Sequence, residues 1–346
     1  MPEALGFSVY LHTFSQQWPV LQPWAFTGSP VFLSLNMGKG EADPGEAEKI
    51  CHKLADHGFR VIADVSTETC KLFDETDLLK LAARLKLRAL RIDYGFSPAQ
   101  IGQMARVMPV VLNASTTDPQ SAAEIFRGGK QVFALHNFYP RPETGLDRER
   151  LFKTTASLQQ AGLKVQAFIP GDSPKRGPLY EGLPTLEDHR NVLPSAAFAD
   201  LALTYHVDDI FVGDPGISLK EQERISLFCR ENILAVPAVL EENYSFLYDL
   251  TFTCRMDSPD HLIRLEESRT IHKIDVVPEP AAVQPRTRGS ITMDNTLYGP
   301  YGGEVQILRA DFQPEKRVNV IGHVEQAALL ITDCIHGGQK FRLVRP

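Results

Sequence analysis

Two aspartates, Asp64 and Asp93, each end an apolar, β-branched run of the sequence, and the two runs follow one another along the chain. If the runs are neighbouring parallel strands, their ends lie about 4.8 Å apart and the carboxylates meet. Proximity then raises the pKa of one of them. Carboxyl groups roughly 5 Å apart suit retaining glycoside hydrolysis, whereas wider spacing suits inversion. In a competing interpretation, an aspartate only caps the helix that follows it. This interpretation fits Asp64, which shortly precedes Ser66 and Thr67, better than it fits Asp93.

Polar residues also end most of the other apolar runs, and a polar group there must be paired or face a solvated cavity. We therefore favour a functional interpretation of this set, which comprises Tyr10, Asn36, Asn113, His136 with Asn137, and Asp214. His136 and its neighbours Asn137 and Arg141 are suited to binding a sugar hydroxyl or an anion. A buried structural histidine is the alternative for His136.

A long polar segment, residues 171–190, follows the seventh apolar run and has the length of a lid or binding loop. It carries charged side chains at Lys175, Arg176, Glu181, Glu187 and Arg190. Glu181 is a candidate catalytic acid supplied by this loop. Thr185 is predicted to cap a helical turn that contains Asp188.

The elements that must position these residues alternate between short apolar runs and longer segments with helical periodicity, which is typical of repeated βα units. The candidate strands are residues 6–11, 30–36, 59–66, 89–96, 109–115, 131–138, 163–171 and 208–216. Eight such strands predict a (β/α)8 TIM barrel, whose active site lies at the C-terminal ends of its strands. Gly58 and Gly162 are predicted helix C-caps. Pro19 and Pro23 make a regular first crossover helix doubtful.

A second, smaller β-domain follows the barrel. Strand-like runs occur at residues 290–295, 303–310, 318–324 and 340–344, after a proline-rich connection. We place the boundary so that residues 1–238 form the barrel domain and residues 239–346 form the β-domain.

Composition excludes several classes of function for this chain of 346 residues. The net charge of −7 argues against a nucleic-acid partner. The five cysteines are scattered without a CxxC pair, and no histidines stand at HExxH spacing, so neither a metal nor another cofactor is predicted. With no signal-like N-terminus and no apolar run of membrane length, we expect a cytoplasmic protein without a membrane partner.

The whole chain resembles the bacterial 6-phospho-N-acetylmuramidase family, whose members have often been labelled outer surface proteins. The segments that carry the resemblance are residues 62–66, 90–97, 136–147, 181–190, 208–218, 294–307 and 317–324. The resemblance implies a TIM barrel joined to a cyclophilin-like C-terminal β-domain. It also implies hydrolysis of the β-1,4 bond between MurNAc-6-phosphate and GlcNAc, a cytoplasmic step in recycling cell-wall sugars.

Positions that match the family, together with Tyr10 from the strand ends, give the expected site residues. The catalytic candidates are Asp93, Asp64 and Glu181, and the substrate-binding candidates are Tyr10, Asn113, His136, Asn137, Tyr139, Arg141, Arg190, Asp214, Asn295 and Tyr298. Because the sugar carries a 2-acetamido group, its amide oxygen is an alternative nucleophile, as in substrate-assisted glycosidases.

The chain departs from the family in two places. The segment between its first two strands lacks the family's acidic, regular first helix. Pro300 stands where the family tends to have an arginine. If that arginine contacts the 6-phosphate, this chain lacks the contact, and a different phosphorylated, or an unphosphorylated, amino-sugar disaccharide is then a candidate substrate.

Two other classes of function stay open from the residues alone. One is another sugar-phosphate barrel enzyme, an isomerase or lyase, although no lysine ends a predicted strand, which disfavours Schiff-base chemistry. The other is a non-catalytic sugar-binding protein. In that last case the β-domain contacts a partner; equally, it could cover the barrel mouth and complete the pocket, for example across a homodimer. The polar strand ends favour hydrolysis.

Overall fold

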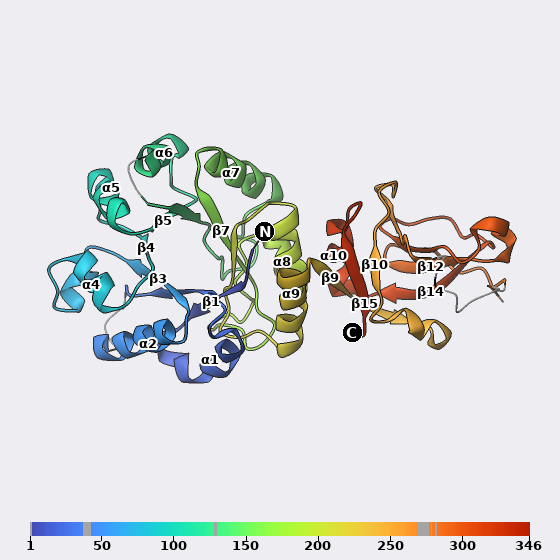
Figure 1. Ribbon diagram of the computed structural model, residues 1–346, viewed down its shortest axis with the longest axis horizontal. Coiled ribbons are helices and arrows are strands. Elements are labelled where there is room, and N and C mark those ends of the chain that lie inside the picture. Colours follow the sequence, from blue (N-terminus) through green and yellow to red (C-terminus); the bar gives the residue numbers. More distant parts are fainter. Residues whose placement is uncertain are drawn as a thin grey trace. The chain divides into compact units, whose positions relative to one another are not determined.

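The computed structural model describes residues 2–36, 43–127, 130–268, 271, 277, 279–280 and 282–346. The chain forms two compact units, the first comprising Met1–Pro194 and Leu201–Gln222, and the second comprising Ser195–Asp200 and Glu223–Pro346 (Figure 1). Each unit has its own sheet. The boundary expected between residues 238 and 239 falls inside a single strand, Ile233–Leu240.

Eight parallel strands close into a barrel in the first unit, and this confirms the predicted fold. They are β1 Leu5–Val9, β2 Pro30–Ser34, β3 Arg60–Val65, β4 Ala89–Ile92, β5 Val110–Asn113, β6 Val132–Leu135, β7 Lys164–Ile169 and β8 Asp209–Val212. Each pairs with the next in sequence, and β8 pairs with β1 to complete the ring. Consecutive strands therefore bring residues that are about 30 positions apart in sequence to one end of the barrel.

The helices lie around the outside of the strands (Figure 1). They are α1 Phe14–Leu21, α2 Pro44–Asp56, α3 Thr69–Leu72, α4 Leu78–Arg84, α5 Pro98–Val107, α6 Pro119–Arg127, α7 Arg148–Gln160, α8 Pro194–Leu203 and α9 Leu219–Glu231. Their starts follow from local sequence: Pro44 and Pro98 occupy first-turn positions, and Asp147 accepts a hydrogen bond from the Arg150 amide at the N-terminus of α7.

The first crossover is irregular, as Pro19 predicts. It consists of the short α1, which contains that proline, between the 3-10 turns η1 Leu11–Thr13 and η2 Gln22–Trp24. Gly58 and Gly162, the two predicted C-caps, have φ values of 78° and 90°, a conformation that glycine adopts without steric cost.

The floor of the barrel is an apolar layer formed by Ile62, Ala89, Val111, Leu135, Phe168 and Phe211. Gly6 leaves room for Phe211, since a Cβ on Gly6 would lie 2.6 Å from the Phe211 ring. Side chains alternate along a strand, so the residue two positions after each floor residue also points inward, one layer nearer the C-terminal end. Among these next residues, Asp64 on β3, Arg91 on β4 and Asn137 after β6 are polar and line the cavity above the floor.

The second unit is built on one seven-stranded sheet with the order β10-β15-β9-β14-β12-β13-β11. Its strands are β9 Ile233–Leu240, β10 Thr251–Thr253, β11 Leu262–Arg264, β12 Ser290–Asp294, β13 Val305–Leu308, β14 Val318–Val324 and β15 Lys340–Val344, with the helix α10 Leu329–Cys334. The four predicted strands correspond to β12, β13, β14 and β15. The outer strands meet through a bridge between Cys254 and Leu265, so the sheet curls back on itself.

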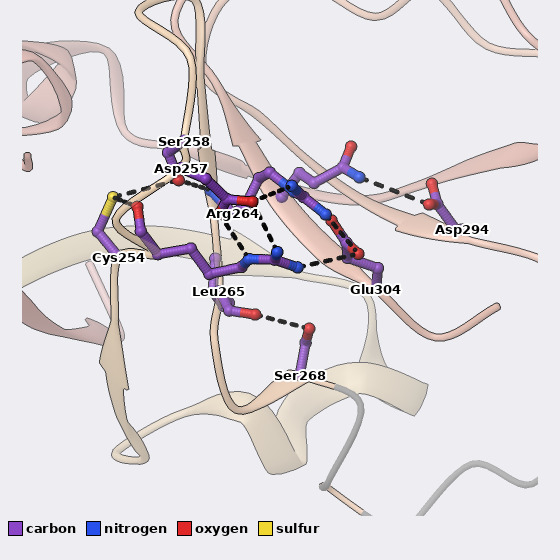
Figure 2. A network of polar contacts seen from close by, with 10 residues as sticks. Cys254, Asp257, Ser258, Arg264, Leu265, Ser268, Asp294 and Glu304 are labelled. Atoms are coloured by element: carbon purple, nitrogen blue, oxygen red, sulfur yellow. Dashed lines mark hydrogen bonds and ion pairs between the residues drawn. The ribbon is translucent and has the colours of Figure 1, made fainter. Parts of the chain in front are cut away.

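An ion-pair network joins the two ends of this curled sheet (Figure 2). Glu304, 3% exposed, accepts hydrogen bonds from Arg264 Nε at 2.6 Å and Nη2 at 3.0 Å. Arg255, just after β10, lies 3.8 Å from the same carboxylate, and Asp257 pairs with both arginines. One buried carboxylate therefore holds two cations that come from opposite edges of the sheet.

We expect Glu304→Gln to lower the free energy of unfolding of the second unit by about 2 kcal/mol. The loss lies below the range for fully buried pairs because Arg264 keeps partial contact with solvent. Urea unfolding of the full chain measures it, with Glu315→Gln, which disrupts the exposed Glu315–Arg317 pair, as the matched control. Equal midpoints for the two variants would contradict the assigned role.

Candidate active site at the barrel mouth

Arg91 joins the two aspartates that end β3 and β4. Its Nη1 donates to Asp64 Oδ1 and to Asp93 Oδ1, each at 2.7 Å. The two oxygens therefore lie no farther apart than twice that distance, within the range of carboxyl pairs that act together on a glycosidic bond. Nη2 of Arg91 donates to Asn137 Oδ1 at 3.3 Å. The structure brings three predicted site residues together through one arginine.

Asn36 binds the same two carboxylates from β2. Its Nδ2 lies 3.3 Å from Asp64 Oδ2 and 3.3 Å from Asp93 Oδ2, and its Oδ1 accepts a hydrogen bond from Thr69. Ser34 Oγ lies 3.5 Å from Asp64 Oδ2. Each aspartate thus has a donor on both carboxylate oxygens, which fixes its orientation.

The two aspartates differ in environment. The Asp64 side chain is 13% exposed and the Asp93 side chain 34% exposed. Burial raises the pKa of Asp64, although the Arg91 charge and its hydrogen bond oppose the change; the negative charge of Asp93 adds a smaller upward effect. Desolvation is therefore the main cause of the raised pKa of Asp64, and the proximity of Asp93, which we predicted as the cause, has a smaller effect. Asp64 is the carboxyl of the pair that holds a proton more readily than usual.

A cavity of about 780 Å³ opens at this end of the barrel. Asn36, Asp64, Arg91 and Asn137 line its polar side, whereas Asp93 is not among the lining residues. The remaining wall includes five aromatic side chains, those of Tyr10, Phe32, Phe138, Tyr139 and Phe168, beside aliphatic residues and Arg176. Aromatic rings beside a few convergent polar groups are typical of a site for a small molecule with both apolar and hydrogen-bonding faces.

Tyr10 and Arg176 form the opposite wall. The Tyr10 hydroxyl donates to the Gly213 carbonyl at 2.5 Å, and burial raises the pKa of this hydroxyl above its usual value. The Arg176 guanidinium lies over the Tyr10 ring, 4.6 Å from its centroid, and 5.8 Å from the Phe138 centroid. Tyr10, Asn137 and Tyr139 are the predicted substrate-binding residues that line the cavity.

Asp214 anchors the loop after β7. Its carboxylate accepts hydrogen bonds from the backbone amides of Gly171 at 2.8 Å, Arg176 at 2.8 Å and Leu183 at 3.0 Å. Burial raises its pKa while these amides lower it. Asp214, a predicted substrate-binding residue, is committed to this loop and does not line the cavity.

Arg190 is likewise committed to a loop. It pairs with Glu187 through Nε at 2.6 Å and Nη2 at 2.7 Å, and it donates to the carbonyls of Gly182 and Tyr139. This hydrogen bonding, with amides of Glu143 and Gly145 donating to Glu187, holds the pKa of Glu187 at about 2. The pair ties the loops after β6 and β7 together, so its guanidinium has no place in the cavity lining.

The prediction that Thr185 caps a helical turn is wrong. The η3 turn, Glu187–His189, has Leu186 at its N-cap, without a side-chain hydrogen bond. Thr185 is fully buried; its Oγ1 accepts from the Phe168 amide and donates to the Asn137 carbonyl, each at 2.9 Å. Its hydroxyl joins β7 to the segment after β6.

His136 points away from the cavity. It is fully buried, and its Nε2 lies 3.0 Å from the Thr155 hydroxyl of α7. Burial lowers its pKa to about 4, so the ring is neutral. Its position follows from strand alternation, since Leu135 and Asn137 on either side face inward. The structure matches the alternative of a buried structural histidine.

Other predicted residues lie outside the cavity lining. Asn113 Oδ1 accepts from the Ser115 amide, and Arg141 and Glu181 are exposed. Asn295 and Tyr298 belong to the second unit, where Asn295 caps the η6 turn Thr296–Tyr301 and Arg317 lies 4.5 Å from the Tyr298 ring centroid. The exposed Pro300 lies in that same turn.

Sequence reasoning missed Arg91 and gave Arg176 no role in the site. The signal for Arg91 was its spacing: it precedes Asp93 by two residues on one strand, so both side chains point to the same face. Within the described residues, no group of three or more histidine, cysteine or acidic side chains is arranged to hold a metal ion. In the same part of the chain no helix is long and apolar enough to cross a membrane.

The fold and the mouth define a (β/α)8-barrel protein whose cavity, at the C-terminal ends of the strands, is lined by Asp64 and Arg91 among other residues. Residues 5–227 match the N-terminal model of the 6-phospho-N-acetylmuramidase family, and residues 232–344 match its C-terminal model. The chain belongs to this family, whose name denotes a glycosidase.

Two solved structures are similar over almost the full length. One is a conserved Enterococcus faecalis protein of unknown function, with a TM-score of 0.86 and 28% identity over 99% of this chain and 96% of that chain. The other is an uncharacterized B. cereus protein, with a TM-score of 0.81 and 23% identity over 99% and 100%. Both share the fold. No curated protein matches this chain.

We expect the buried, neutral His136 to make stability depend on pH. The unfolded chain binds a proton at this ring below about pH 6.5, whereas the folded chain does so only near pH 4. Stability is therefore lost as the pH falls from 6.5 to 4, by up to about 3 kcal/mol.

His136→Gln removes this contribution, so its free energy of unfolding should change less over that interval than that of the wild type. Urea unfolding between pH 7 and pH 4 measures the difference. His206→Asn, at an exposed histidine with a φ of 54° that asparagine tolerates, is the control. Identical pH dependence in wild type and His136→Gln would contradict the neutral buried ring.

Proposed function

We propose that this protein hydrolyses the β-1,4 bond of a phosphorylated amino-sugar disaccharide, MurNAc-6-phosphate joined to GlcNAc. The observation that carries the proposal is the Asp64–Arg91–Asp93 cluster at the mouth of the barrel. Two carboxyl groups in unequal environments are the minimal machinery of glycoside hydrolysis. The family to which the chain belongs supports this chemistry.

Asp64 is the general acid in this proposal. It lines the cavity, is the more buried of the pair, and has a raised pKa, so it retains a proton that it can donate to the glycosidic oxygen. Loss of that proton leaves a carboxylate that Arg91 stabilises at 2.7 Å. The same carboxylate then accepts a proton from the water that completes hydrolysis.

Asp93 supplies the second carboxylate. Hydrogen bonds from Arg91 and Asn36 occupy one site on each of its oxygens and fix its orientation. A carboxylate held in this way suits orienting and stabilising a positively charged reaction centre. The 2-acetamido oxygen of the substrate then attacks the anomeric carbon, as in substrate-assisted glycosidases.

The rest of the cavity suits a sugar. Its volume of about 780 Å³ lies within the range of small-molecule sites. Aromatic side chains at Phe32, Phe138 and Phe168 offer apolar surface to the C–H faces of a pyranose ring. Asn137 and Tyr139 offer polar groups to its hydroxyls. We further propose that the reaction belongs to cytoplasmic recycling of cell-wall sugars.

Incubation with the disaccharide tests the proposal, with both products followed by mass spectrometry. We expect release of GlcNAc, and a decrease in kcat of about 100-fold or more in Asp64→Asn and in Asp93→Asn. Asp188→Asn is the matched control, because that exposed carboxylate pairs with Arg148 on the surface and lies outside the cavity lining. If the wild type cleaves neither the phosphorylated nor the unphosphorylated disaccharide, the proposal fails.

The pH dependence of kcat/KM tests the role of Asp64. Activity should fall as the pH rises above the pKa of Asp64, because the acid loses its proton. Arg91 holds that pKa down, so Arg91→Gln should move this alkaline limb to higher pH while lowering the maximum rate. If the alkaline limb of the kcat/KM profile stays at the same pH in Arg91→Gln, or moves to lower pH, the general acid is a group other than Asp64.

A further inference from the structure

We propose that Arg176 is the residue that recognises the phosphate group of the sugar substrate. This inference rests on the proposed function and names the contact that sets its preference for a phosphorylated sugar. Arg176 lies in the loop after β7 and lines the cavity together with Tyr10 and Phe138. It was not among the site residues expected from the sequence.

The charges that line the cavity leave Arg176 available for an anion. Arg91, the other arginine of the lining, is occupied by the carboxylates of Asp64 and Asp93. In the part of the chain that the structure describes, no carboxylate oxygen lies within 4 Å of the Arg176 guanidinium. A cation without an acidic partner, facing a small-molecule cavity, favours a negatively charged ligand group.

The position of the guanidinium is fixed by contacts that use only part of its donor set. Its central carbon lies 4.6 Å from the Tyr10 ring centroid, its side chain hydrogen-bonds the Tyr10 hydroxyl, and its backbone amide donates to Asp214 at 2.8 Å. A guanidinium carries five N–H donors, so one bond to a hydroxyl leaves others for a ligand. Two such N–H groups match two oxygens of a phosphate, the bidentate geometry for which arginine is preferred over lysine.

Its place in the barrel separates the phosphate from the catalytic carboxylates. Asp64 and Asp93 end β3 and β4, and Arg176 follows β7, which is across the eight-stranded ring. A phosphate carries close to two negative charges and is repelled by carboxylates nearby. A sugar whose anomeric carbon lies at Asp64 can direct its 6-phosphate toward the opposite wall, where Arg176 neutralises it.

This assignment also bears on the departure at Pro300. The family tends to have an arginine in the turn where this chain has proline, and the phosphate preference depends on Pro300 only if that arginine contacts the 6-phosphate. Arg176 supplies a cation for the same ligand from the barrel unit itself. Loss of the turn arginine then does not remove recognition of a phosphorylated sugar.

The test compares kcat/KM for the disaccharide with and without its 6-phosphate in wild type, Arg176→Ala and Arg176→Lys. We expect the preference of the wild type for the phosphorylated form to fall about 10- to 100-fold in Arg176→Ala, mainly through KM. Arg176→Lys should keep part of the preference, since it retains the charge without the bidentate fork. Lys175→Ala, which removes a like charge one residue away and outside the cavity lining, should behave as the wild type.

Binding measurements separate this inference from the proposed function. The dissociation constants of MurNAc-6-phosphate and MurNAc, measured by titration calorimetry, should differ in the wild type and converge in Arg176→Ala. If the wild type cleaves neither disaccharide but this pattern holds, hydrolysis is refuted and phosphate recognition stands. An unchanged preference in Arg176→Ala overturns the inference. Equal losses of affinity for both sugars also overturn it, because Arg176 then binds the lactyl carboxylate that the two sugars share.

Discussion

One guanidinium nitrogen, Nη1 of Arg91, lies between the carboxylates of two adjacent strands, 2.7 Å from each. A buried arginine is costly unless it is paired, and two carboxylates at the end of a barrel are costly unless a cation lies near them. The guanidinium and the two carboxylates therefore offset one another's free-energy cost of burial. The apolar layer that contains Ile62 and Ala89 lies beneath the cluster, and Asp64 and Arg91 face the cavity.

The same cluster explains why two similar aspartates acquire different properties. They share a cation and an amide donor, so their partners do not distinguish them. Their exposure distinguishes them. The Asp64 side chain is 13% exposed and its pKa is raised, whereas the Asp93 side chain is 34% exposed. A barrel that places neighbouring strand ends at slightly different depths can thus give two residues of one type different environments.

Much of this architecture could be predicted from the sequence, because strands and glycine caps depend on local patterns. The eight strands, the irregular crossover at Pro19 and the meeting of Asp64 with Asp93 all followed from spacing. The loops did not, because their contacts are distant in sequence and involve backbone groups. Asp214 binds amides up to 43 residues away, and Arg190 binds carbonyls up to 51 residues away. Such residues resemble site residues in sequence, since both are polar and follow strands; only geometry shows that they hold loops.

For Arg91 the i, i+2 relation to Asp93 was available, but a charged residue inside a barrel strand is readily taken for an outward-facing one.

We propose that the glycosidic bond is broken at the Arg91-bridged pair. A crystal structure of Asp64→Asn with the intact phosphorylated disaccharide would show where that bond lies. We expect the glycosidic oxygen within hydrogen-bonding distance of residue 64, with the sugar ring against the aromatic side chains of the cavity. A disaccharide bound with its glycosidic oxygen away from residues 64, 91 and 93 would contradict it.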